Sequence, residues 1–276
     1  MSAAAELEAP APRLRVAVAG ANGRMGQMLI EQVLAAPDLQ LAAALVRVGS
    51  ESLGRAAGST RMAEDCAANL NGAEVLIDFT RPDAAPAHLE MARSTGCALV
   101  LGTTGFDATA QAALTQAARE QRLLWAPNTS LGVNIVYELL AQAARRLAAA
   151  DYDLEIVEAH HRHKVDAPSG TALQMGEVAA QARGVQLSDV AVRTRDGHVG
   201  ARPRGAIGFA TVRGGSVIGD HQALFCGEHE VIEIAHRSAS RIHYATGALA
   251  AARFLLRQPT GRLYRMADVV ADLETA

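Results

Sequence analysis

Three histidines and a lysine stand within five consecutive positions in the middle of the chain. The run is His160-His161-Arg162-His163-Lys164, and Ser169-Gly170-Thr171 follows a few residues later. Lys164 is the only lysine among 26 basic residues, and all the others are arginine. Because an ammonium group can give up a proton and a guanidinium effectively cannot, this segment is the first candidate for chemistry that needs a titratable cation.

Four interpretations of this segment compete. A metal site is disfavoured, because adjacent residues of a strand face opposite ways and no cysteine or carboxylate cluster completes a ligand set, so we expect no metal. Nucleophilic catalysis would need a serine or cysteine turn that is lacking. A polar surface loop stays open. We favour a cationic pocket for an acidic small molecule, in which the N–H groups of Gly170 and Thr171 open a helix capped by Ser169.

A glycine-rich turn near the amino terminus is the second candidate site. Gly20, Gly23 and Gly26 follow the apolar run 14–20. Glycines at such positions permit a tight turn and let the backbone approach a pyrophosphate, whose oxygens meet the N-terminus of the next helix. The place of the triplet, between a predicted strand and a predicted helix, indicates a dinucleotide site. A structural turn without a ligand is the alternative.

The end of the second predicted strand, 39–46, bears on which dinucleotide fits. Sites specific for NAD usually carry an acidic side chain there, which binds the ribose 2′-hydroxyl. This chain has Val46 followed by Arg47. A guanidinium can pair with a 2′-phosphate, so we expect NADPH to be accepted at least as well as NADH. Arg24 is a second candidate for that phosphate, and a solvated loop charge is the alternative for Arg47.

Up to about residue 130, short apolar runs alternate with helical stretches. The predicted strands span 14–20, 39–46, 74–80, 97–105 and 122–128, and the predicted helices span 24–36, 82–94 and 108–120. This alternation predicts an α/β fold with a parallel sheet covered by helices on both faces.

The pattern changes after residue 130. A long helix over about 132–149 leads to a strand at 152–160 and a helix that begins near Ser169, and 190–240 reads as strands without intervening helices. Such strands pair as an antiparallel or mixed sheet. Helices near 242–257 and 265–274 close the chain. We therefore predict a first domain over 13–130, joined by 241–276, and a second domain over 131–240.

Composition excludes several classes of protein. The formal net charge is −3, which leaves no basic excess to neutralise nucleic-acid phosphates. No apolar run reaches the ~18–20 residues of a membrane helix, and the Ala/Pro-rich residues 1–12 lack the features of a secretory signal and are predicted to be a disordered tail. Three cysteines, none in a CxxC pair, suit a reducing cytoplasm. We expect a cytoplasmic protein with neither nucleic acid nor membrane as partner.

Four motifs together resemble those of a known family. GANGRMG, IDFTRP, GTTGF and EAHHRHKVDAPSGTA are similar to the motifs of 4-hydroxy-tetrahydrodipicolinate reductase (dihydrodipicolinate reductase), of lysine and diaminopimelate biosynthesis. The resemblance runs from about Leu14 to the end of the chain. It implies a Rossmann-like dinucleotide-binding domain that includes the C-terminal helices, and a central α+β domain with a mixed sheet that binds substrate and assembles a homotetramer.

The resemblance also implies roles for individual residues. In that family a small dicarboxylate, 4-hydroxy-2,3,4,5-tetrahydrodipicolinate, is reduced by NADPH or NADH with loss of water. His160 matches the catalytic acid of the family, and Lys164 matches the partner of that acid. The residues that match the family's contacts to the substrate carboxylates are His161, Ser169, Gly170 and Thr171. The matching cofactor residues are Gly20, Ala21, Asn22, Gly23, Arg24, Met25, Gly102, Thr103, Thr104, Ala126, Pro127, Asn128 and Thr129, to which the residues themselves add Arg47. Thr129 stands where an aromatic residue is common.

Two other functions stay open at this point. The chain could be a related two-domain NAD(P)-dependent dehydrogenase of another small acid, although the loop offers more cationic groups than one carboxylate needs. It could also be a regulator that senses NAD(P)H without turnover. Such a regulator usually adds a DNA-reading module or a basic face, and the sequence shows neither.

Overall fold

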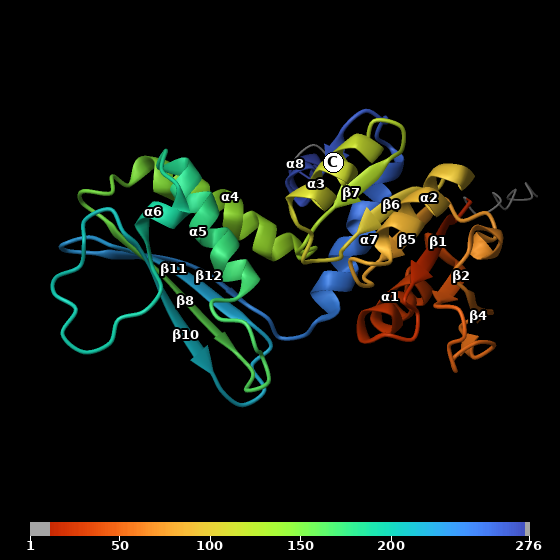
Figure 1. The fold of residues 1–276 in the computed structure, drawn as a ribbon, viewed down its shortest axis with the longest axis horizontal. Helices are drawn as coiled ribbons and strands as arrows, with labels where there is room; N and C mark the ends of the chain where they lie inside the picture. The colour runs from red at the N-terminus through yellow and green to blue at the C-terminus, as the bar shows by residue number, and fades with distance from the viewer. Residues whose placement is uncertain (1–11, 274–276) are drawn as a thin grey trace, which may run out of the picture. The chain divides into compact units, whose positions relative to one another are not determined.

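The structure is a computed structural model that describes residues 12–273 (Figure 1). The described chain forms two compact units: unit 1 comprises 12–129 and 245–273, and unit 2 comprises Ser130–Tyr244. Except for Pro12, the tail expected over 1–12 lies outside the described residues. No helix within the described residues is long and apolar enough to cross a membrane.

Unit 1 is built on an eight-stranded sheet in the order β13-β7-β6-β5-β1-β2-β4-β3. All neighbouring strands are parallel except β3 and β4. The strands are β1 (Leu14–Ala19), β2 (Leu39–Val46), β3 (Ala56–Ala57), β4 (Thr60–Glu64), β5 (Val75–Asp78), β6 (Ala98–Leu101), β7 (Leu123–Trp125) and β13 (Leu263–Tyr264). The central strands are buried along nearly their whole length, as expected for a parallel sheet with both faces covered. The predicted α/β class is confirmed.

The helices of unit 1 follow the sequence pattern closely. They are α1 (Arg24–Ala35), the 3₁₀ helix η1 (Ala67–Leu70), α2 (Ala85–Thr95), α3 (Ala108–Ala117), α7 (Ile242–Leu256, whose first three residues belong to unit 2) and α8 (Met266–Leu273). Met91 of α2 and Leu114 of α3 are buried in one apolar cluster with residues of β5, β6 and β7. The division into units places α8 and α7 from Ala245 onward with residues 12–129.

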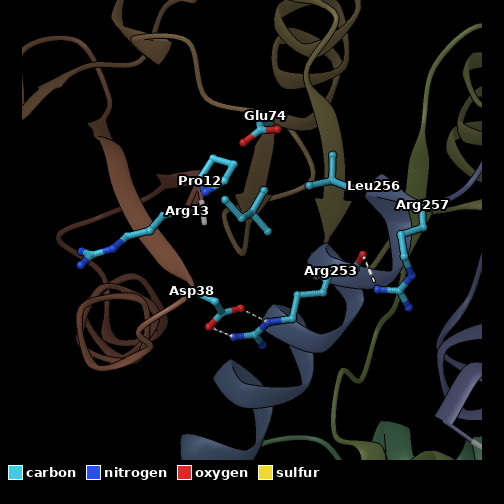
Figure 2. Close-up of a pocket in the computed structure, with 8 residues that line it drawn as sticks. Pro12, Arg13, Asp38, Glu74, Arg253, Leu256 and Arg257 are labelled. Atoms are coloured by element: carbon cyan, nitrogen blue, oxygen red, sulfur yellow. Dashed lines mark hydrogen bonds and ion pairs between the residues drawn. The ribbon is translucent and has the colours of Figure 1, made fainter. Parts of the chain in front are cut away.

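A hollow of about 360 Å³ lies at the amino edge of the unit 1 sheet (Figure 2). Its lining includes Leu14, which opens β1, and Asp38, which precedes β2. Arg253 of α7 donates to both carboxylate oxygens of Asp38, at 2.7 and 2.9 Å, and so ties the returning chain to the start of the sheet. Since ligands of open parallel sheets bind at the carboxyl ends of the strands, this hollow is on the wrong edge for a dinucleotide.

Three strands of unit 1 were not expected from the sequence. β4 pairs with β2 in a stretch that reads only as polar and Gly-containing, because Met62 is its one buried residue. β3 and β13 contain two residues each, too few to produce a pattern. The segment 97–105, expected to be a strand running into a Gly/Thr turn, has its strand end at Leu101 and a loop after it. The shortness of β3 and β13 and the single buried residue of β4 explain why the sequence did not reveal these three strands.

Unit 2 has a five-stranded mixed sheet in the order β12-β11-β8-β10-β9. The strands are β8 (Asp153–His160), β9 (Ala191–Val192), β10 (Ile207–Arg213), β11 (Asp220–Cys226) and β12 (Val231–Arg237), and the helices are α4 (Leu131–Arg146), α5 (Gly170–Ala182) and α6 (Leu187–Val190). β8 is parallel to β10 and antiparallel to β11, so the sheet is mixed as predicted. Strand structure is less extensive than expected, since 193–206 is loop.

The two faces of the unit 2 sheet differ. α4 and α5 lie along one face (Figure 1), and side chains such as Leu140, Ile156 and Phe225 form the core between them and the sheet. β8 alternates strictly, so that every second residue, including Glu158 and His160, points toward the helices and is buried. The polar pair at the end of β8 is therefore placed on the covered face by the same alternation that places Leu154 and Ile156 in the core.

Candidate active site

The carboxyl edge of the unit 1 sheet collects the segments predicted to bind a dinucleotide. The chain leaves β1 for β2 on one side and returns to β5 on the other, so the order of strands reverses at β1 and β5. In open parallel sheets such a switch point is where ligands bind. The Gly20 turn, Arg47, Gly102 and Ala126 directly follow β1, β2, β6 and β7, so parallel strands bring all four to this edge.

The Gly20 turn is shaped by steric limits. Gly20 has a φ of +66°, and the Gly23 N–H donates to its carbonyl oxygen at 2.8 Å. A Cβ atom on Gly26 would collide with that same carbonyl, so the close approach of α1 to the turn requires glycine there. Gly23 caps α1 without a side-chain hydrogen bond. The turn thus offers the bare N-terminus of a twelve-residue helix to an anion.

Polar side chains continue the site toward the end of β2. The Asn22 amide donates to Ser50 and Ser52 hydroxyls at 3.4 and 3.3 Å. Arg24 and Arg47 are exposed, and within 12–273 neither guanidinium has an ion-pair partner. Ala21 is buried and Met25 half-buried, so they shape the turn from below. These residues fit the adenosine half of a dinucleotide, with two cations available for a phosphate.

The other predicted cofactor segments are held to one another by hydrogen bonds. The Gly102 N–H donates to the Asp78 carbonyl at 2.7 Å, and the Thr103 hydroxyl donates to the Thr80 carbonyl at 3.0 Å. The Trp125 indole N–H donates to the Thr103 carbonyl at 3.0 Å. The Thr80 hydroxyl is buried and has no partner in the part of the chain described, which fits a site where a bound polar group supplies one.

The last cofactor segment differs in exposure from residue to residue. The Ala126 N–H donates to Leu101 at 2.9 Å and its side chain is buried. Pro127 and Thr104 are exposed, Asn128 is half-buried and Thr129 is fully buried. The Thr129 side chain is therefore packed in the protein interior. The exposed Thr104 and Pro127 are the residues available to a ligand.

In unit 2 the main feature is a carboxylate buried at the end of β8. The Glu158 side chain is only 1% exposed, and its Oε2 lies 2.6 Å from His160 Nδ1. Arg213 donates to both carboxylate oxygens at 2.7 and 2.8 Å. The Ser169 N–H and the Thr211 hydroxyl also donate to it, at 3.0 and 3.2 Å. Buried charge is stable only when paired and hydrogen-bonded in this way.

These contacts decide the protonation of the pair. Burial by itself raises the pKa of Glu158, but the hydrogen bonds from Arg213, His160 and Ser169 outweigh it and hold the pKa below its usual value. An ionised Glu158 only accepts hydrogen bonds, so His160 must carry its proton on Nδ1. Burial lowers the pKa of His160 and Glu158 opposes this, while Lys164 and Arg213 lower it further. In the free protein His160 is therefore mainly neutral near pH 7.

A second buried imidazole lies against the first. The rings of His160 and His221 meet edge to face, with centroids 5.0 Å apart. His221 Nε2 is 3.0 Å from the Ser169 hydroxyl, which also accepts from the Ala172 N–H and caps α5. Burial and the nearby His160 lower the pKa of His221 to about 3, so this ring stays neutral. A Cβ atom on Gly170 would meet open space, so the first turn of α5 is accessible to a ligand.

The solitary lysine lies at the same site. Lys164 Nζ is 2.8 Å from Asp166 Oδ1, and its side chain is about one-fifth exposed. The Asp166 carbonyl accepts from Arg213, the guanidinium that also holds Glu158. His161 Nε2 is 3.4 Å from the Arg241 guanidinium, while His163 is exposed. The structure thus brings His160, Lys164 and the start of α5 together and sets His163 apart.

Four residues of this site were missed from the sequence. Glu158 had a usable signal, because it stands two positions before His160 and strand alternation places both on one face. The other three residues, Arg213, His221 and Arg241, come from distant parts of the chain. His221 lies at the site because the register of β11 on β8 pairs it with Glu158. Among the described residues, no three His, Cys, Asp or Glu side chains gather in a way that could hold a metal ion.

Comparison with known proteins assigns both units to one family. The family description "Dihydrodipicolinate reductase, N-terminus" matches residues 14–129, and "Dihydrodipicolinate reductase, C-terminus" matches residues 132–270. The 4-hydroxy-tetrahydrodipicolinate reductase of Ralstonia nicotianae is 52% identical over 93% of this chain and 99% of that protein. That of Nitrosospira multiformis is 51% identical over 93% and 97%.

A solved structure agrees with these matches. The dipicolinate-bound dihydrodipicolinate reductase from Paenisporosarcina sp. TG-14 superposes with a TM-score of 0.73 and 25% identity, over 92% of this chain and 97% of that one. Both sequence and fold therefore lead to the same assignment: the chain belongs to the dihydrodipicolinate reductase family.

Proposed function

We propose that this chain reduces 4-hydroxy-2,3,4,5-tetrahydrodipicolinate to 2,3,4,5-tetrahydrodipicolinate with loss of water, using NADPH or NADH, in the lysine and diaminopimelate pathway of the cytoplasm. The observation that carries the proposal is the His160 imidazole, held on Nδ1 by a buried carboxylate and adjacent to the only lysine. Membership of the family supplies the reaction and the substrate class.

Some of the cofactor residues bind phosphate groups, and the others shape the site. NAD(P)H, when bound, supplies the hydride. The turn Gly20–Met25 and the N-terminus of α1 hold the pyrophosphate, and Arg47, with Arg24, holds a 2′-phosphate. In the segments Gly102-Thr103-Thr104 and Ala126-Pro127-Asn128-Thr129, the exposed or half-buried Thr104, Pro127 and Asn128 form the rest of the cofactor surface, and the buried residues hold them in place. The open α1 N-terminus and the orphaned Thr80 hydroxyl support this assignment.

Two substrate carboxylates need cationic or N–H partners, and unit 2 offers both. Lys164, His161 and the helix start at Ser169-Gly170-Thr171 are assigned to them. The Lys164 ammonium binds Asp166 in the free protein, at 2.8 Å, so a substrate carboxylate has to compete with or share that contact. More than one cation at the site favours a dicarboxylate over the single-acid substrates of other dehydrogenases.

The proton comes from His160 Nε2. Hydride arrival leaves electron density on the ring that must be protonated, and a nearby imidazolium is a suitable general acid at neutral pH. The ionised Glu158 favours the protonated ring and keeps Nδ1–H directed away from substrate. Burial lowers the pKa of His160 in the free protein. The negative charges of bound substrate raise this pKa, so His160 becomes protonated and can act as the acid when substrate is bound.

The uncovered face of the unit 2 sheet supports a homotetramer. On this face Val212 of β10 and Val231 of β12 are 53% and 60% exposed, and the half-buried Val157 and Leu224 lie between them. Polar side chains such as Glu233 lie on the same face, so the surface is mixed, and valines this exposed on it fit a surface that another copy covers. We assign it to copies of this chain.

Replacing Lys164 tests the active site. We expect Lys164→Ala to lower kcat/KM by roughly 10²–10⁴, because a charge contact and a proton-transfer partner are lost together. The assay uses enzymatically generated substrate with NADPH and with NADH. Lys164→Arg separates charge from proton transfer, since only the charge is retained. Wild-type turnover in Lys164→Ala would remove this residue from the mechanism, and no turnover in the wild type would refute the proposed reaction.

Replacing Arg47 tests cofactor selection. We expect Arg47→Ala to raise the KM for NADPH about tenfold or more and to leave the KM for NADH nearly unchanged, because only NADPH carries the 2′-phosphate. Arg24→Ala is the companion variant, which shows whether the second guanidinium shares the phosphate. Equal effects of Arg47→Ala on the two cofactors would mean that its guanidinium does not contact the phosphate.

Ligand binding should be accompanied by proton uptake. The pKa of His160 is lowered by burial, so the ring is mainly neutral before binding, and two carboxylates raise that pKa. Pyridine-2,6-dicarboxylate should therefore take up protons on binding near neutral pH, and its affinity should fall as the pH rises. Calorimetry in buffers of different ionisation enthalpy measures the uptake. His160→Gln should abolish it; uptake that persists in this variant would assign the proton elsewhere.

Size-exclusion chromatography with light scattering tests the assembly. We expect the wild type to elute with four times the mass of one chain. Val212→Glu places a charge on the uncovered sheet face and should shift the protein to smaller species, because a buried unpaired charge is costly. Leu139→Glu, on an exposed position of α4, is the matched control and should not. A monomeric wild type would contradict the tetramer.

A further inference from the structure

Three ionisable side chains meet in the interior of unit 1, beneath the carboxyl edge of the sheet. His88 of α2 lies between two carboxylates: its Nδ1 is 2.6 Å from Asp78 Oδ2 and its Nε2 is 2.6 Å from Asp65 Oδ2. The side chains of His88 and Asp78 are 1% and 0% exposed, and that of Asp65 is 19% exposed. None of the three belongs to the residues assigned so far to cofactor or substrate.

The ring is held as an imidazolium. Burial alone lowers the pKa of His88, but the hydrogen bonds to Asp65 and Asp78 raise it to about 10. Both ring nitrogens therefore donate, one to each carboxylate. A protonated ring therefore connects the two carboxylates, and giving up the bond to Asp78 would leave that buried carboxylate without its cation.

One side of this connector leads to the end of β2. Asp65 follows β4, and its N–H donates to the Val46 carbonyl at 2.9 Å. Val46 is the last residue of β2 and directly precedes Arg47, the residue assigned to the 2′-phosphate. A displacement of Asp65 is thus passed through one hydrogen bond to the backbone that carries Arg47.

The other side leads to the Gly20 turn and to the loop after β6. Asp78 Oδ1 accepts from the Thr80 N–H at 2.6 Å, and the Asp78 carbonyl accepts from Gly102. Thr80 is packed closely on Gly20: a Cβ atom added to Gly20 would lie 2.9 Å from the methyl group of Thr80. The Thr80 carbonyl also holds Thr103. Asp78 therefore fixes two of the segments assigned to the cofactor.

Stability alone does not require this arrangement. Buried ion pairs lose much of their attraction to desolvation, and apolar side chains of similar volume are often as stabilising. Here one cation faces two carboxylates, and Asp65 Oδ1 is buried without a partner within residues 12–273. What the three groups do provide is a fixed distance between the end of β2 and the end of β5.

We propose that His88 is a positioning residue of the dinucleotide site, whose two hydrogen bonds hold the Arg47 side and the Gly20–Thr103 side of that site in register. This inference rests on the proposed dinucleotide function. His88 touches neither cofactor nor substrate, and its effect passes through Asp65 and Asp78. The two halves of a dinucleotide bind one rigid surface when the imidazolium is in place and two loosely coupled surfaces when it is absent.

Replacement by glutamine tests the proposal in the full-length protein. Trp125 is the only tryptophan and donates to Thr103, so quenching of its fluorescence reports NADPH binding directly. We expect His88→Gln to weaken NADPH about tenfold or more, because loss of register misplaces contacts at both ends. Binding of 2′-AMP, whose single phosphate reaches only the Arg47 side, should weaken much less. The KM for the dicarboxylate substrate should stay within about twofold, since unit 2 is unchanged.

Met91→Ala is the matched control. Met91 lies on the same helix and is buried in the core, so its truncation destabilises unit 1 by packing loss without touching the two hydrogen bonds. It should lower the melting temperature and leave NADPH affinity unchanged. An equal loss of NADPH affinity in Met91→Ala and His88→Gln would overturn the proposal, since the effect would then follow stability.

A milder variant covers the case in which His88→Gln does not fold. Asp65→Asn keeps an oxygen acceptor for His88 but removes the charge, and we expect it to weaken the binding of NADPH more than that of 2′-AMP. Unchanged NADPH affinity in every variant that folds would refute a positioning role. A wild type that fails to bind NADPH would instead refute the proposed function, so the two failures are distinguishable.

Discussion

A single carboxylate removed from water governs the chemistry of unit 2. Glu158 remains ionised because Arg213, Ser169, Thr211 and His160 all donate to it. Those donors come from β8, β10 and the start of α5, so the loops around the site are connected through one group. Without them a carboxyl buried to this degree would be neutral, and its hold on the imidazole would be lost.

Unit 1 also has a binding surface whose loops are fixed in place, but other interactions fix them. Parallel strands bring the segments to one edge, steric contact at Gly26 sets the turn, and the His88 imidazolium links two strand ends. In both units a buried ionised group fixes loops that follow strands. The exposed Arg47 and the partly exposed Lys164 are then presented to a ligand on a backbone that stays in place.

Sequence reasoning succeeded where a signal is local. The long apolar strands have a clear period, so the α/β class was predictable. The Gly20 turn and the cluster from His160 to Lys164 are contiguous, so the sequence alone could single them out as candidate sites, and their roles stay predictions. β4 was not predictable, because a single buried residue, Met62, leaves no pattern. Arg213 and His221 were not, because sheet register, which depends on the whole fold, brings them to Glu158. The cluster of His88, Asp65 and Asp78 was missed for the same reason.

The central claim is that Glu158 holds the proton of neutral His160 on Nδ1 and leaves Nε2 facing the reaction. Long-range ¹H–¹⁵N NMR of ¹⁵N-histidine-labelled protein at about pH 8 measures this tautomer, and His160→Gln identifies the signal. The account predicts a protonated Nδ1 and a bare Nε2, and it predicts that Glu158→Gln removes this preference. A proton on Nε2 with a bare Nδ1 in the wild type would contradict it.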